Sequence, residues 1–303
     1  MTNPRRPAPG KGGSEPPRRA GGTSPSATPD GAAPGPDVHR ILERRHHKGG
    51  DYWATEDGRV YVGNPYSTIS SLLMLHELGV ERTHEAVEGG RRLILEACRE
   101  DGRIRVGPRS PLYPCYTGEA ARVLCRFGLQ GDPRVERTTA YFLDDAHEGG
   151  GWRCSFSRFG KGPETRCANP GATLYVLDAL RFTDAAGTET ATAAVDFLLG
   201  HWEIREPIGP CHWGIGSRFL KVEFPFLRYN LFYWVYVLSF YPTARGDERF
   251  LDAYRVLHDK LDDRERVVVE HRHRGLKGLE FCARGEPSEV ATRRLREIEA
   301  NLA

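Results

Sequence analysis

Four segments of the chain repeat one pattern: an apolar helix that follows a small or polar residue, a second helix, and then a turn rich in glycine or charged residues. The segments are residues 67–103, 117–152, 170–200 and 229–264. Leu75 of the first segment and Leu124 of the second occupy equivalent positions, 49 residues apart. A period of this length is typical of helical hairpins stacked side by side. The sequence therefore predicts an all-α protein of about four to five helical hairpins.

In such an array one helix of each hairpin lines an inner face and the other lies outside. The first helix of each segment is the more apolar, which predicts that it forms the inner layer. The N-termini of these first helices would then meet at one shared rim. A last helix opens at Pro287-Ser288-Glu289 and runs to Leu302, and we expect it to cap the array.

The array is expected to form a single domain over residues 38–303. Residues 1–37 hold nine of the 21 prolines and no large apolar residue after Met1. A segment of this composition cannot bury enough surface to offset the entropy of ordering it. We therefore leave it out of the fold, as a disordered tail.

Charge and hydropathy exclude two classes of partner. The 43 basic and 41 acidic residues give a formal charge of +2, so no global field favours nucleic acid or an anionic membrane. The most apolar run, residues 231–241, is too short and too interrupted to span a bilayer. No hydrophobic signal core stands near the N-terminus, so we expect a cytoplasmic location, where the seven cysteines would be free thiols or metal ligands.

Three cysteines and a histidine could meet at the rim of the array. Cys115 and Cys167 stand at the N-termini of the second and third inner helices, where unpaired N–H groups favour the thiolate. Cys154 follows the glycine-rich turn on the route to the third inner helix, and His212 lies in a loop before the fourth. Three thiolates and an imidazole would make a tetrahedral zinc site.

The fourth ligand of that site stays open between His212, Cys211 and Glu223, which all precede the fourth inner helix. The spacing is not that of a standard zinc finger. Small cysteines packed between helices are the alternative explanation of the whole set.

Residues 264–282 combine a β-branched run, Val267-Val268-Val269, with His271, His273 and several arginines and lysines. The β-branched run predicts an extended strap that closes the array. The cations predict a solvated basic face on that strap.

Two motifs and the repeated inner helices resemble those of a known superfamily. The turn Gly150-Gly151-Trp152-Arg153-Cys154, the helix start Cys115-Tyr116-Thr117-Gly118 and the leucine-rich inner helices resemble the α/α toroids of protein prenyltransferase β subunits and of squalene or terpene cyclases. More narrowly, the chain resembles small bacterial prenyltransferase-like proteins, over roughly residues 52–270. The resemblance implies an α/α toroid, with an incomplete ring as the alternative, and an isoprenoid or other apolar substrate in a central cavity.

The chain departs from these families in several motifs. It lacks the D-x-D-D motif of class II cyclases, and its nearest pattern to the Asp-x-Cys of prenyltransferases is Glu164-Thr165-Arg166-Cys167. Prenyltransferases also work with a companion subunit, so we expect either such a partner or a homodimer. Lanthionine synthetase cyclases, another α/α toroid, hold zinc with a Cys-His pair similar to Cys211-His212.

Two carboxylates are candidates for acid–base catalysis in such a site. Glu119 follows Cys115 by one helical turn, and Asp178 lies midway along the third inner helix. A carboxyl group buried there would have a raised pKa and could donate a proton. Each could instead be a capping or salt-bridged group.

Aromatic side chains would be needed to steady a carbocation formed from an isoprenoid. The candidates are Tyr116, Trp152, Tyr229 and Trp234. The alternative is that these rings pack one helix on another.

Three hypotheses follow. The first is a zinc-containing enzyme, similar to prenyltransferases or terpene cyclases, that acts on an isoprenoid or other apolar molecule. The second is a non-catalytic helical module that binds a peptide or lipid and uses its cysteines, or a metal, for structure. The third is a zinc-dependent cyclase of a modified peptide, which requires Cys211 and His212 at the metal.

Overall fold

The computed structural model describes residues 35–62, 65–154 and 162–303, and the part it describes is helical. The helices are α1 (Pro36–Leu42), α2 (Thr68–Glu77), α3 (Glu85–Glu96), α4 (Pro114–Arg126), α5 (Pro133–Asp144), α6 (Pro170–Leu180), α7 (Glu189–Ile204), α8 (Leu231–Leu238), α9 (Pro242–Arg245), α10 (Glu248–His258) and α11 (Glu289–Leu302). Within these ranges, extended backbone pairs only as isolated bridges. The prediction of an all-α protein is therefore confirmed, whereas the proposed tail of residues 1–37 lies almost wholly outside the described residues.

Side-chain caps fix where the inner helices begin. Ser67 accepts a hydrogen bond from the Ser70 amide at the start of α2, and Asn169 does the same for the Ala172 amide at the start of α6. Such caps satisfy amide groups that have no partner within the helix. The α4 helix differs from expectation, because Pro114 occupies its first turn and starts it three residues before Thr117.

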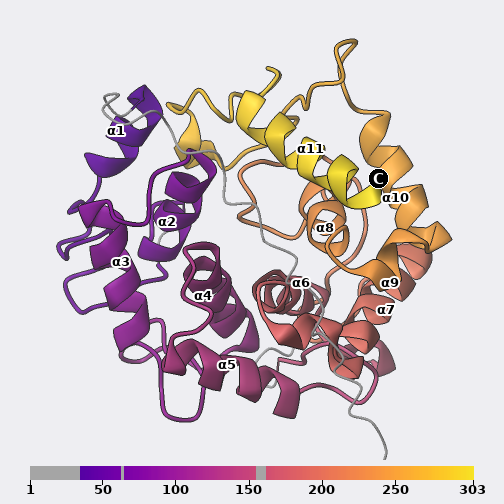
Figure 1. Cartoon of the computed structure of the whole chain (residues 1–303), viewed down its shortest axis with the longest axis horizontal. Helices are drawn as coiled ribbons and strands as arrows, with labels where there is room; N and C mark the ends of the chain where they lie inside the picture. The colour runs from indigo at the N-terminus through magenta and orange to yellow at the C-terminus, as the bar shows by residue number, and fades with distance from the viewer. Residues whose placement is uncertain (1–34, 63–64, 155–161) are drawn as a thin grey trace, which may run out of the picture.

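The first helix of each hairpin lies inside, as its apolarity predicts. Figure 1 shows α4, α6 and α8 toward the middle of the molecule, with α3, α5, α7 and α10 around the outside. Neighbouring inner helices are in contact, from α2 to α4, α6 and α8 in turn. All residues of α6 and α8 are buried, whereas α3, α5 and α10 bury one side only. The finer description of this arrangement as an α/α toroid stays a prediction.

The glycine-rich turn joins the second hairpin to the third. Gly150 and Gly151 both adopt positive φ, at 83° and 76°, a conformation that favours glycine. A Cβ atom at Gly150 would lie 2.3 Å from the Ala193 carbonyl oxygen of α7. Trp152 then inserts its fully buried ring and donates from Nε1 to the Phe142 carbonyl oxygen of α5 at 2.8 Å. The turn therefore fixes α5 against α7.

The last helix connects the two ends of the inner series. On α11, Arg294 Nε donates to Glu77 Oε2 of α2 at 2.6 Å. On the other side, Tyr236 of α8 donates from its hydroxyl to Glu297 Oε2 at 2.7 Å. Glu77 also accepts from Arg126 Nη1 of α4 at 3.2 Å, although its side chain is only 2% exposed. The helix thus bridges the first and fourth inner helices, through a buried ion pair with α2 and a hydrogen bond with α8.

No helix among the described residues is both long and apolar enough to cross a membrane.

Replacing Arg294 with Met should lower the free energy of unfolding by about 3 kcal/mol, because Glu77 would lose one of its two cations while staying buried. Urea denaturation measures this difference. The matched control is Arg296→Met on the same helix, whose side chain is 52% exposed beside Glu299. That substitution should cost less than about 1 kcal/mol, and equal effects of the two would contradict the bridging role of Arg294.

Candidate functional site

The four predicted metal ligands lie in two pairs. Cys115 is in the first turn of α4, and Cys154 is close enough for its charge to act on the Cys115 thiol. Cys167 donates from Sγ to the Glu164 carbonyl oxygen at 3.2 Å, and His212 Nε2 lies 3.4 Å from Glu164 Oε1. Glu164 therefore joins Cys167 to His212.

The thiols are not poised as thiolates, so that expectation is wrong. Burial raises the pKa of Cys115 to about 12, against the small opposing effect of backbone N–H groups at the start of α4. Burial also raises the pKa of Cys167. The cost of placing a charge in an apolar setting outweighs what a helix N-terminus contributes.

Zinc needs three or four protein ligands. Within residues 35–62, 65–154 and 162–303, no group of three or more His, Cys, Asp or Glu side chains is placed to hold a metal ion. Glu223, an alternative fourth ligand, contacts Arg218 and His271 instead. The zinc site stays a prediction, and we derive no chemical step through a metal.

The two candidate catalytic carboxylates lie in buried ion pairs. Asp178 accepts from Arg126 Nη2 at 2.9 Å, from Arg181 Nε at 2.8 Å and from the Tyr233 hydroxyl at 2.8 Å. Burial would raise the pKa of Asp178, but the surrounding arginines outweigh it and hold the pKa well below its usual range. The expected raised pKa is therefore wrong for Asp178, which is a poor proton donor.

For Glu119, the expected direction of the pKa shift is correct. Burial raises the pKa of its carboxyl group above the usual value, against the opposing charge of Arg122. Arg122 Nε donates to Glu119 Oε2 at 2.8 Å, and the Tyr61 hydroxyl lies 3.3 Å from Oε1. Both carboxylates are thus salt-bridged, which was the alternative for each.

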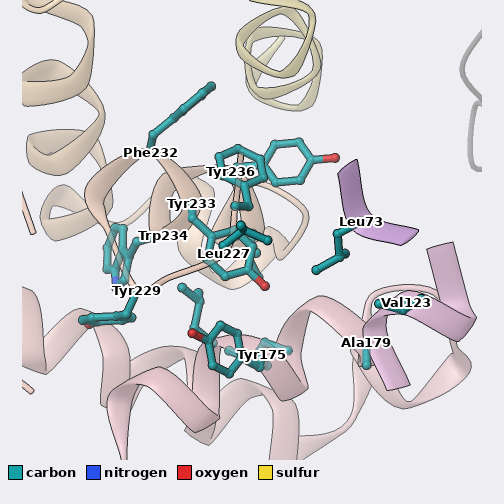
Figure 2. Packing of buried hydrophobic residues seen from close by; sticks show 14 of the residues in the cluster. Leu73, Val123, Tyr175, Ala179, Leu227, Tyr229, Phe232, Tyr233, Trp234 and Tyr236 are labelled. Carbon is teal, nitrogen blue, oxygen red and sulfur yellow. The ribbon is translucent and has the colours of Figure 1, made fainter. Parts of the chain in front are cut away.

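Three of the four candidate aromatic residues are buried and pack against residues of the neighbouring helices or loops. Trp152 contacts Phe142, Trp234 stacks on Phe250, and the buried Tyr229 hydroxyl lies 2.9 Å from His201 Nδ1. Figure 2 shows the rings of Tyr233 and Tyr236 beside Leu227, in a region filled by buried side chains.

Tyr116 differs, because it is only half-buried. Its ring lies edge-on to Tyr61 at 5.3 Å and to Tyr113 at 5.0 Å between ring centres. Of the four aromatic candidates, Tyr116 is therefore the one that is open to a ligand.

A different part of the chain forms a basic cavity of about 610 Å³. Six cationic side chains and two imidazoles line it, with no carboxylate in the lining: Arg218, Arg228, His271, Arg272, His273, Arg274, Lys277 and Arg284. We call this the basic cavity.

Two segments that are distant in sequence build the basic cavity. Residues 218–228 precede α8, and residues 271–284 lie between α10 and α11. The Val222 carbonyl oxygen accepts from the amides of Glu270 at 2.9 Å and His271 at 3.1 Å, which joins the segments. The predicted strap is thus an extended segment held against the loop before α8.

Further hydrogen bonds fix the strap beyond His271. Arg272 Nη1 donates to the Leu276 carbonyl oxygen at 2.8 Å, around the short turn Arg274–Leu276. Asp37 of α1 accepts from the amides of Glu280 and Phe281, at 2.9 and 2.7 Å. These bonds hold the cations around one cavity although many of their side chains are exposed.

The cations of the basic cavity are only partly neutralised. Arg218 Nη2 lies 2.9 Å from Glu223 Oε2. In the described part of the chain, the side chains of four others form neither an ion pair nor a hydrogen bond: Arg228, Arg274, Lys277 and Arg284. Like charges gathered in this way repel one another and create a local positive potential.

The positive potential contributes to the lowered pKa values of the two imidazoles. Burial, then the charges of Arg218 and Lys221, lower the pKa of His271 to about 4. Burial, then Arg228 and Arg274, lower the pKa of His273. Both imidazoles are therefore mainly neutral at pH 7.

A search of protein-family models finds no match for this sequence, and a search of curated proteins finds no significant match. The resemblance to α/α-toroid proteins stays a prediction.

Proposed function

We propose that the protein binds a small anionic ligand in the basic cavity, and that the helical array is the scaffold for this site. The observation that carries the proposal is the set of four cations around one cavity whose side chains have no ion-pair or hydrogen-bond partner among the described residues. An anion would relieve their mutual repulsion and accept charge-assisted hydrogen bonds from the guanidinium groups. This is a binding function, of the same class as the second hypothesis but with a different ligand and a different surface.

The size of the basic cavity supports a small ligand. Its volume of about 610 Å³ is within the range of small-molecule sites, roughly 300–1,000 Å³. The positive charge is also local, since the chain as a whole carries a formal charge of +2. A long nucleic acid would need a basic surface that extends well beyond one cavity.

Removing one unpaired cation should weaken the binding of inorganic phosphate by about fivefold, since each lost charge removes part of the attraction. Isothermal titration calorimetry on Arg284→Gln measures this effect. Arg255→Gln is the matched control, because Arg255 is also an exposed arginine but pairs with Glu248 outside the lining. Phosphate binding that is absent, or equally weakened by both substitutions, would contradict the proposal.

The zinc-enzyme hypothesis keeps one supporting observation. Cys115 and Cys154 approach each other beside Glu119, whose pKa is raised by burial, and the half-buried Tyr116 lies next to Cys115. An isoprenoid or other apolar substrate would have to bind at this half-exposed rim, because Asp178 and the rings of α8 are buried among other side chains. The peptide-cyclase hypothesis has weaker support, since His212 lies beside Glu164 and Cys167.

The zinc-enzyme hypothesis predicts about one zinc ion per chain in protein purified without added metal, measured by mass spectrometry. Cys115→Ser and Cys154→Ser should each lose the metal. Cys125→Ser should retain it, because Cys125 is buried within α4 away from the helix N-terminus. Protein that lacks zinc, or that keeps it in all three variants, would rule out this pair as the metal site.

A further inference from the structure

We infer that the ligand of the basic cavity is a small polyvalent anion with three or four negative charges, and that its binding adds a proton to His271. This inference rests on the proposed function and narrows it to one class of ligand.

The expected charge of the ligand follows from the number of lining cations that have no partner in the described part of the chain. Four lining cations have side chains with no ion-pair or hydrogen-bond partner among the described residues. The other two are already engaged, Arg218 by Glu223 and Arg272 by the carbonyl oxygen of Leu276. A dianion such as sulfate would balance about half of the four open charges. A ligand with three or four charges matches them, and the Coulomb energy at a partly exposed site favours that match.

The four open cations also belong to both segments of the cavity. Arg228 lies on the loop before α8, whereas Arg274 and Lys277 lie on the strap and Arg284 lies just after it. They are spread around a cavity of about 610 Å³, which is large for a single small acidic group. Several acidic groups on one compact frame could bridge the loop and the strap.

His271 is placed to respond to such a ligand. Its buried Nδ1 atom has no hydrogen-bond partner among the residues that the structure describes, and Glu223 Oε1 lies 3.7 Å away, just too far for a bond. Glu223 is itself buried, with its side chain 4% exposed. A proton on Nδ1 would find an acceptor in Glu223 after a small movement of the imidazole ring.

The other charges around His271 are mostly positive. Those that lower its pKa are, in order, Arg218, Lys221, Arg228 and Arg284. The neighbouring carboxylate, Glu270, is engaged by Lys260 Nζ at 3.1 Å. His273 faces Arg228, Arg274 and Arg218. A polyvalent anion would offset these cations and raise the pKa of His271, so affinity should increase as pH falls from 7 toward 5.

Sulfate and sulfonates are suitable probes, because they keep the same charge between pH 5 and pH 8. Any proton taken up on binding must then come to the protein. We would titrate the full chain with sulfate and with benzene-1,3,5-trisulfonate at pH 5, 6 and 7. Calorimetry in buffers of different ionisation enthalpy gives both the Kd and the number of protons bound.

The trisulfonate should bind at least about tenfold more tightly than sulfate at pH 7, and at least about fivefold more tightly at pH 5 than at pH 7. His271→Gln should keep the preference for the trisulfonate but lose most of the proton uptake. Arg274→Gln should reduce that preference, since it removes one exposed, unpaired cation. Arg255→Gln should change neither property.

Equal affinities for the two probes would overturn the polyvalent ligand. Unchanged proton uptake in His271→Gln would overturn the role of His271. Both results differ from failure of the proposed function, in which neither probe binds, or in which binding does not depend on any residue of the basic cavity.

Discussion

The arrangement of the inner helices depends on the buried ion pairs between Asp178 and the arginines around it. Its carboxylate joins Arg126 of α4, Arg181 at the C-terminal end of α6 and Tyr233 of α8. Arg126 extends the same network to Glu77 of α2, and Glu77 extends it to α11. Buried charges are costly unless each is paired, so such a network tolerates few alternative arrangements of the five helices.

The same network affects where a ligand can bind. The resemblance to α/α toroids predicts an apolar substrate between the inner helices. Here Arg122, Asp178 and Tyr233 are fully buried in that region and satisfy one another. The unsatisfied charge is instead found on the strap and on the loop before α8, where neighbouring cations lower the pKa of His271. We therefore place the proposed binding function at the basic cavity.

The sequence predicted the helices well, because apolar periodicity and capping residues such as Ser67 and Ser288 are local signals. It did not predict that Arg122 and Arg126 point inward, since Asp178, which pairs with both, lies on another helix. The candidate site was harder to predict than the helices. The basic residues of the strap were visible as a run, but Arg218 and Arg228 are distant in sequence, so only the fold brings them to the same cavity. The pairing of Cys167 with Glu164 likewise depends on loop geometry that no spacing reveals.

The central claim is that the charge network of Asp178 holds the inner helices together. Urea denaturation of Asp178→Asn tests it most directly, because asparagine keeps the shape of the side chain and removes its charge. The account predicts a loss of about 3–5 kcal/mol in the free energy of unfolding, since Arg126 and Arg181 would stay buried without their shared carboxylate. A loss of less than about 1 kcal/mol, typical of an exposed ion pair, would contradict it.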